Sequence, residues 1–205
     1  MAALKQLGAR AVLATTVVGA VDPSVLLGRP ILFDDLFFPE NRLPNGEPCT
    51  IFTEPGDPAR GHFIGSESFS PNLRRKVELA ARDLGIKVAM GGIYAHTNGP
   101  RFETRAEIKA LDAAGVSAVS QTCGPEAILA KELGMSYALV GFPVNRATGV
   151  GGPEPKEELD RLLTLSAKVL PQLVLRTVET LEEKDLAFEQ GYVYRVEGGV
   201  GLRED

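Results

Sequence analysis

The alternation of short apolar runs with amphipathic segments that end at glycine most constrains how this chain can fold. Apolar, β-branched runs at 9–15, 117–120 and 136–142 predict buried strands. Segments 71–84, 104–114 and 125–133 have helical periodicity, and each is followed by a glycine, the residue that favours helix ends. Strands alternating with helices predict an α/β fold, with three α/β/α layers around a mostly parallel, mixed central sheet.

The remaining segments are assigned by the same rules. We expect helix over 2–7 and 157–183, the second kinked at Pro171, and strands over 30–34 and 86–95. Segment 37–61 is rich in Pro, Gly and charge and predicts a long loop, and 144–155 predicts a glycine-rich loop. Residues 1–189 therefore form a single α/β domain. The tail 190–205 is expected to be partly disordered, with 192–196 able to form a short strand.

Composition excludes several classes of function. The net charge is −5, and no basic cluster is longer than Arg74, Arg75 and Lys76, which argues against nucleic-acid binding. No apolar run approaches the about 18 residues that a membrane span needs. Cys49 and Cys123 lack metal-ligand spacing and there are only two histidines, so we predict no metal site and a reducing compartment, the cytoplasm.

The candidate ligand-binding residues are organised around the stretch 91–110, GGIYAHTNGPRFETRAEIKA. This stretch predicts a buried strand, a Gly-Pro turn and a helix start, with Phe102 beside Glu103 at the turn. Gln121 and Thr122 follow the next strand, Asn145 follows another, and Thr16 and Val17 follow the first. Because α/β sheets place ligands at the carboxyl ends of strands, these residues are candidates for one site.

Three segments, GPRFETRAEI, TCGPEAILAKELG and SYALVGFPVN, resemble in order and spacing the trimeric purine nucleoside phosphorylase and methylthioadenosine phosphorylase family. The resemblance covers about residues 2–180 and implies a phosphorylase/hydrolase-like fold. It also implies that phosphate displaces a purine from the ribose C1′ atom, yielding free base and ribose 1-phosphate. Inorganic phosphate is then the co-substrate, with no metal or organic cofactor, and a homotrimer is expected.

The resemblance assigns the base-binding residues. Phe102 matches an aromatic that packs on the purine, and Glu103 the carboxylate that accepts N1–H of a 6-oxopurine. Asn145 matches the amide that binds N7 and O6, so Glu103 and Asn145 are the catalytic candidates. The adenine-preferring branch has Ser and Asp at these two positions, which favours hypoxanthine or guanine nucleosides. A core position for Phe102, a helix-start carboxylate for Glu103 and a turn role for Asn145 are the structural alternatives.

The resemblance also assigns contacts to phosphate and sugar. Thr122, the Thr16 hydroxyl and the Val17 backbone N–H match phosphate contacts, although either threonine could instead cap a helix or turn. Gln121 falls where the family has a Met against the ribose. His62 matches a side chain that reaches the sugar 5′ end across the trimer interface, or is a surface histidine. Leu159 falls near a histidine that binds the 5′-hydroxyl, and an apolar residue there suits a 5′-methylthio group.

One part of the family pattern has no counterpart in this sequence. Family members carry a further βαβ unit before the position of Met1, with a Gly-rich phosphate loop and an Arg-His pair. The sequence is therefore expected to be an N-terminally shortened version of the fold, whose exposed sheet edge association would cover. Three alternatives remain open: an active phosphorylase, a purine-binding homologue without catalysis, or a subunit completed by a second chain. Hydrolysis by water is a weaker alternative, because no carboxylate is evidently placed to activate water.

Overall fold

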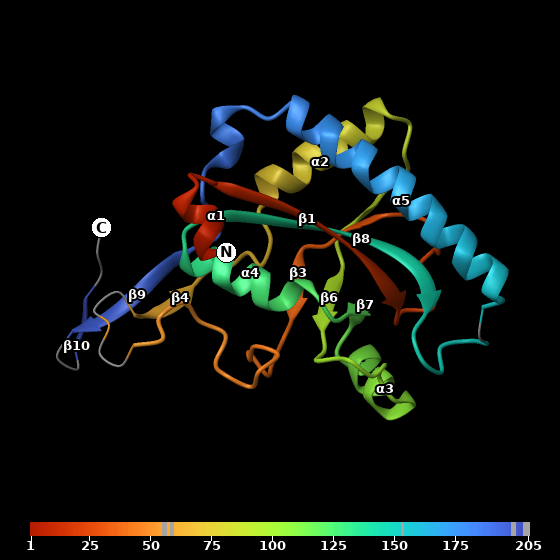
Figure 1. The fold of residues 1–205 in the computed structure, drawn as a ribbon, viewed down its shortest axis with the longest axis horizontal. Helices are drawn as coiled ribbons and strands as arrows, with labels where there is room; N and C mark the ends of the chain where they lie inside the picture. Colours follow the sequence, from red (N-terminus) through yellow and green to blue (C-terminus); the bar gives the residue numbers. More distant parts are fainter. Residues whose placement is uncertain (55–56, 58–59, 153, 198–199, 203–205) are drawn as a thin grey trace.

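The computed structural model describes residues 1–54, 57, 60–152, 154–197 and 200–202. A curled central sheet lies between two groups of helices (Figure 1). Helices α2 (Pro71–Asp83) and α5 (Lys156–Glu179) lie on one side, and α3 (Arg105–Ala113) and α4 (Cys123–Glu132) on the other. The predicted α/β class with helices flanking a mixed sheet is confirmed.

The described residues form a seven-stranded sheet with the order β3-β6-β7-β1-β8-β2-β5. Its longest ladder joins β1 (Ala11–Ala20) and β8 (Ser136–Arg146) in parallel, whereas β7 (Val116–Ser120) runs antiparallel to β1. Pairs β2–β5, β3–β6 and β6–β7 are parallel and β2–β8 is antiparallel. The sheet is therefore mixed and mostly parallel, as predicted.

The same two chain segments form both edges of the sheet, β3 with β6 at one edge and β2 with β5 at the other. Strands β2 (Ile31–Leu32) and β3 (Asp35–Phe37) follow each other closely, and so do β5 (Ala89–Met90) and β6 (Ile93–His96). Between the two paired halves, the backbone N–H groups of Asp34 and Asp35 donate to the Gly92 carbonyl. Segment 31–37 thus pairs with 89–96 along its length, and the sheet curls into a ring.

The prediction of a single strand over 86–95 is wrong, because the segment forms two strands, β5 and β6. Gly91 and Gly92 break it, with φ of 82° and 126°, a backbone conformation that side chains other than glycine rarely adopt. An ideal Cβ on Gly91 would also lie 2.8 Å from Asp34 Oδ2. The break separates β5, which pairs with β2, from β6, which pairs with β3, and this change of partner closes the ring.

The predicted helices are present, with small shifts at their ends. Ser70 caps α2 by accepting from Leu73 N at 3.4 Å, and Gly85, Gly115 and Gly134 follow α2, α3 and α4 with positive φ. Helix α1 (Ala2–Gln6) matches 2–7. Helix α5 contains Pro171 and ends at Glu179, four residues before the predicted 183, and a short 3₁₀ helix, η1 (Glu183–Leu186), follows.

Strand β8 separates the two main parts of the core. Tyr137 and Leu139 pack with Ala127 and Ala130 of α4, whereas Val140 and Phe142 pack with Leu162 and Leu173 of α5. A strand buried on both faces explains the continuous apolar run of its sequence. Strands β1 and β8 run on past their predicted ends at 15 and 142, because their mutual ladder continues to Ala20 and Arg146.

A small second sheet was not foreseen. Strand β4 (His62–Ile64) lies immediately after the predicted long loop and pairs with β9 (Tyr192–Glu197), which pairs with β10 (Val200–Leu202). The predicted strand over 192–196 is confirmed as β9. The parts of the tail at 198–199 and 203–205 lie outside the described residues. Loop 37–61, apart from the end of β3, holds only an Arg42–Pro48 bridge among its described residues.

Candidate functional site

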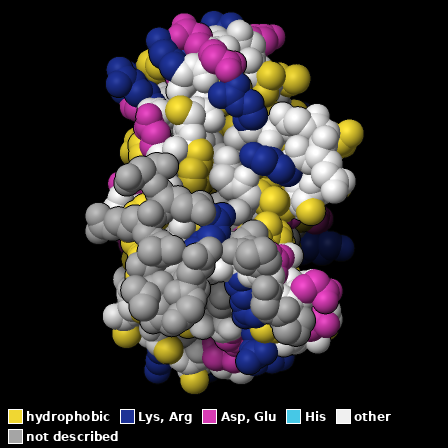
Figure 2. Space-filling view, turned by 90° about the vertical axis from the view of Figure 1, so that its left-hand side faces the viewer, with side chains coloured by type: hydrophobic (Ala, Val, Ile, Leu, Met, Phe, Trp, Pro, Cys, Tyr) yellow, Lys and Arg dark blue, Asp and Glu magenta, His cyan; other side chains and the backbone are white. Residues whose placement is uncertain are grey.

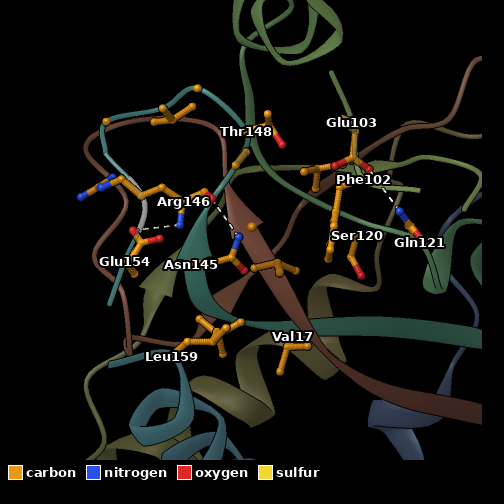
Figure 3. Close-up of a pocket in the computed structure, with 18 of the residues that line it drawn as sticks. Val17, Phe102, Glu103, Ser120, Gln121, Asn145, Arg146, Thr148, Glu154 and Leu159 are labelled. Carbon is orange, nitrogen blue, oxygen red and sulfur yellow. Dashed lines mark hydrogen bonds between the residues drawn. The ribbon is translucent and has the colours of Figure 1, made fainter. Parts of the chain in front are cut away.

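A cavity of about 770 Å³ lies where the last residues of β1, β7 and β8 meet (Figure 3). The turn before α3 and the loop 147–152 complete its walls, together with Glu154 and two leucines of α5. Six of the predicted site residues line this cavity: Val17, Phe102, Glu103, Gln121, Thr122 and Asn145. The topology therefore assembles residues that lie far apart in the sequence.

Phe102 and Glu103 lie side by side in the sequence but differ sharply in exposure. The Phe102 side chain is 79% exposed, which excludes an ordinary core position, whereas Glu103 is only 8% exposed. Glu103 is not the residue that caps α3: Thr104 is the N-cap, and Glu107 completes the capping box by accepting from Thr104 N at 2.6 Å. The helix-start role considered for Glu103 thus belongs to its neighbours.

Two neutral donors surround one oxygen of the buried Glu103 carboxylate. The Thr97 hydroxyl donates to Oε1, and Gln121 Nε2 lies 3.5 Å from the same atom. No hydrogen bond from the described part of the chain reaches Oε2. The carboxylate therefore retains acceptor capacity at the cavity wall.

Asn145 is held at the end of β8, opposite Gly19 of β1. Its Nδ2 donates to the Arg146 carbonyl at 2.8 Å, as Figure 3 shows. A Cβ on Gly19 would lie 3.4 Å from this nitrogen, so glycine leaves room for the amide. The β1–β8 register shifts between Val18 and Gly19, at the edge of the cavity. Since a primary amide carries two N–H donors, one remains for a ligand.

Three hydroxyl groups gather beneath the cavity. Thr16 Oγ1 lies 3.0 Å from Thr122 Oγ1 and 3.3 Å from Ser120 Oγ. Thr122 stands at the N-terminus of α4 and its side chain makes no capping bond there. Hydroxyl donors beside a helix N-terminus suit an anion. The two predicted phosphate-contacting threonines are therefore neighbours in space.

His62 is the one predicted site residue that lies away from this group. It belongs to β4, where it pairs with Tyr194, and it does not line the cavity. Its predicted role towards a neighbouring subunit stays a prediction. His96 is buried against Phe38, with ring centroids 4.6 Å apart, and burial lowers the pKa of its imidazole. His96 therefore packs in the interior of the fold, and it does not line the cavity.

Sequence reasoning missed several polar residues of the cavity. Arg146 and Glu154 are linked by a 3.1 Å bond from Arg146 N to Glu154 Oε1, and Arg105 packs its stem on Gly149. Ser120 joins the hydroxyl group described above. Their sequence signal is weak, because a polar residue at a strand end or in a glycine-rich loop is ordinary. Adjacency to Asn145 and Gln121 is the only hint for Arg146 and Ser120.

Within the described ranges, no three His, Cys, Asp or Glu side chains are grouped so as to hold a metal ion. None of the helices in those ranges is both long and apolar enough to cross a membrane.

Residues 1–179 match the model of the Phosphorylase superfamily, and the chain belongs to this family. It is 32% identical over 188 residues to the 6-oxopurine nucleoside phosphorylase of Pyrococcus furiosus, covering 89% of this chain and 69% of that protein. It is 36% identical to a probable 6-oxopurine nucleoside phosphorylase of Moorella thermoacetica, covering 86% and 66%. A probable S-methyl-5′-thioinosine phosphorylase of Methanopyrus kandleri is 33% identical, covering 89% and 69%.

The fold agrees with solved structures of the same family. Methylthioadenosine phosphorylase from Schistosoma mansoni, in complex with adenine, superposes with a TM-score of 0.75 at 22% identity, covering 90% of this chain and 71% of that one. The family match and the relatives named above confirm the predicted resemblance to the purine nucleoside phosphorylases. It spans about two thirds of the length of the curated relatives named above.

Proposed function

We propose that this chain forms the purine-nucleoside site of a 6-oxopurine nucleoside phosphorylase. In the proposed reaction a phosphate oxygen forms a bond to the ribose C1′ atom as the C1′–N9 bond breaks. The bonding electrons leave with the purine, which takes up a proton, so the products are the free base and ribose 1-phosphate. Phe102, Glu103 and Asn145 would bind the purine base. The hydroxyls of Thr16 and Thr122 would bind phosphate.

The convergence of Glu103, Asn145 and Phe102 on one cavity carries the proposal. A buried carboxylate can accept the N1–H of a 6-oxopurine, and the free N–H of Asn145 can donate to its O6 or N7 atom. Because negative charge develops on the leaving base, an amide donor there stabilises the transition state more than the ground state. The exposed Phe102 ring offers a face for the purine.

The proposed phosphate-binding part of the site is formed by Thr16 and Thr122. Thr16 and Thr122 offer hydroxyls at the N-terminus of α4, and the Val17 backbone is adjacent. Neutral donors of this kind hold a dianion less strongly than a cationic side chain does. Phosphate is therefore expected to bind weakly to this chain alone, whereas the base binds without it.

A second substrate is favoured by the leucines of α5. Leu159 and Leu163 line the cavity, and an apolar wall suits a 5′-methylthio group better than a 5′-hydroxyl. The relatives named for S-methyl-5′-thioinosine support this choice. 5′-Methylthioinosine is thus the preferred nucleoside to test beside inosine. A Leu159→His variant is expected to lower the ratio of kcat/KM for 5′-methylthioinosine over inosine.

The deciding experiment is calorimetry of the chain with hypoxanthine and guanine, with and without phosphate, together with a phosphorolysis assay on both nucleosides. Base binding that tightens with phosphate, with turnover, supports the phosphorylase. Base binding that ignores phosphate, without turnover, would instead support a purine-binding homologue. Absence of any base binding would contradict the proposal.

Assembly and location complete the proposal. By resemblance we propose a homotrimer, with His62 reaching the sugar 5′ end of a neighbouring site; a monomer in sedimentation would contradict it. Cytoplasmic location is proposed from the two buried cysteines, both free thiols. Phosphate is the proposed co-substrate, and no metal or organic cofactor is proposed.

A further inference from the structure

We propose that Gln121 is a positioning residue, which fixes the Glu103 carboxylate and so sets the preference of the cavity for bases that carry a ring N–H. The proposal rests on the function proposed above and deepens it. Gln121 comes from the β7–α4 junction, whereas Glu103 comes from the turn before α3. Figure 3 shows the two side chains facing each other across the cavity wall.

The amide nitrogen of Gln121 is already committed to this turn. Nε2 lies 2.7 Å from the Arg101 carbonyl and 3.5 Å from Glu103 Oε1, the latter at the long limit for a hydrogen bond. An amide nitrogen carries two hydrogens, so one can serve each acceptor. With both hydrogens directed to the protein, the amide has no donor left for a ribose hydroxyl.

The oxygen of the same amide lies against the backbone of the turn. A Cβ built on Gly99 would stand 2.2 Å from Gln121 Oε1, closer than atoms can approach. Glycine at position 99 therefore permits the amide to lie directly on the chain. The close fit argues that Gln121 has one orientation here rather than several.

The far side of the turn is fixed independently. The Arg101 guanidinium binds both carboxylate oxygens of Glu107 at 2.7 and 2.8 Å, and Glu107 also belongs to the capping box of α3. Gln121 holds the near side through the Arg101 carbonyl. The turn that carries Glu103 is thus held on one side by the Arg101–Glu107 ion pair and on the other by Gln121.

This mounting has a consequence for the choice of base. Thr97 and Gln121 both direct donors at Oε1, which keeps Oε2 as the acceptor that remains for a ligand. A 6-oxopurine presents an N–H at N1, whereas a 6-aminopurine presents a lone pair there. A fixed carboxylate acceptor binds the 6-oxopurine through this N–H and repels the lone pair of the 6-aminopurine. A carboxylate that rotates freely would discriminate less between the two bases.

The test is calorimetry of the full chain with hypoxanthine and with adenine, for the parent and a Gln121→Met variant. Met matches the length of the side chain but has no donor. We expect hypoxanthine affinity to fall about tenfold, as for one lost hydrogen bond to a charged group, with little change for adenine. Gln172→Met, on the exposed face of α5, is the matched control and should change neither affinity.

Two further variants separate positioning from direct contact. In a Glu103→Gln background, adding Gln121→Met should produce no further loss; a full tenfold loss there would mean that Gln121 binds the base itself, and would overturn the proposal. Gln121→Glu has the same shape but cannot donate at neutral pH. Its hypoxanthine affinity should be low at pH 7 and recover towards acid pH as the new carboxyl is protonated.

The outcomes distinguish this proposal from the one on which it rests. If the parent binds hypoxanthine and Gln121→Met keeps the same hypoxanthine-to-adenine ratio, the positioning role is overturned while the phosphorylase site stands. If Gln121→Met does not fold, the pH profile of Gln121→Glu decides in its place. If the parent binds neither base, the proposed function fails and this inference fails with it.

Discussion

The hydroxyl oxygens of Thr16 and Thr122 lie 3.0 Å apart, although 106 positions separate these residues in the sequence. Thr16 stands on β1 and Thr122 at the start of α4, so the contact forms only when the sheet is complete. Ser120 Oγ, 3.3 Å from Thr16 Oγ1, makes the group a triad of hydroxyls. Two of these side chains were identified from sequence as phosphate contacts, and the third was not.

Replacing Thr122 by Val should weaken the binding of phosphate and leave the binding of the base unchanged. Valine keeps the shape and removes the hydroxyl donor, which typically costs about 0.5–1.5 kcal/mol for a neutral hydrogen bond. The phosphate KM, or the phosphate-dependent gain in base affinity, should therefore worsen roughly three- to tenfold. Thr164→Val on the exposed side of α5 is the control. An unchanged phosphate dependence in Thr122→Val would contradict the assignment.

Asn145→Asp should reduce turnover more than it reduces binding of nucleoside. Aspartate is isosteric but cannot donate to the purine or to the Arg146 carbonyl, which accepts at 2.8 Å. Loss of a donor at a developing charge typically lowers kcat by about two to three orders of magnitude. The measurement is steady-state phosphorolysis of inosine and 5′-methylthioinosine. An increase in KM with kcat unchanged would show that the amide acts only in binding.

Gly141→Ala should destabilise the fold by overpacking the core behind β8. A Cβ at this position of β8 would meet Phe33 Cε2 at 2.4 Å and Val18 Cγ1 at 3.2 Å, inside a filled core. Overpacking of this kind costs about 1–3 kcal/mol of unfolding free energy. Urea unfolding measures the change. Gly152→Ala, where the added Cβ meets nothing within 4 Å, is the control and should leave the urea midpoint nearly unchanged.

Acid should weaken the protein partly through Glu107. Hydrogen bonding from the Arg101 guanidinium, and then from the Thr104 backbone, lowers the pKa of Glu107 from 4.5 to about 2. The lowered pKa means that its stabilising contribution is present above pH 4.5 and is lost as the pH falls towards 2.

Glu107→Gln should therefore lower the melting temperature at neutral pH and converge with the parent near pH 2. Thermal unfolding across this range measures the difference between the two proteins. Asp112→Asn, an exposed carboxylate on the same helix, serves as the control. A parent-minus-variant difference that stays constant with pH would contradict the role of the Arg101 pair.

Local patterns predicted the elements that depend on local interactions. The helices followed from periodicity and from glycines such as Gly85 and Gly115, whose positive φ ends a helix whatever surrounds it. The break at Gly91 and Gly92 was missed, because an apolar run with two glycines also fits one continuous strand. Only the pairing of β5 with β2 and of β6 with β3, which is tertiary, separates the two.

The site shows the same division. Phe102, Glu103 and Asn145 were identified because they stand in recognisable segments, and the structure brings them to one cavity. Arg146 and Glu154 were missed, because their place in the cavity depends on how loop 147–152 folds back. The contact between Gln121 and the Arg101 carbonyl joins residues 20 positions apart and has no local signature.

The ring formed by the central sheet also determines when this protein can fold. Its closure needs segment 31–37 against 89–96, and it needs β1 against β8, which ends at Arg146. Contacts between segments so distant in sequence require the chain to lose loop-closure entropy before the contacts stabilise it, and this slows folding. During synthesis on the ribosome, β1 must therefore wait until residue 146 has left the exit tunnel. Until then its apolar residues lack their partner strand, and unpaired strands of this kind make a partly folded chain prone to aggregation.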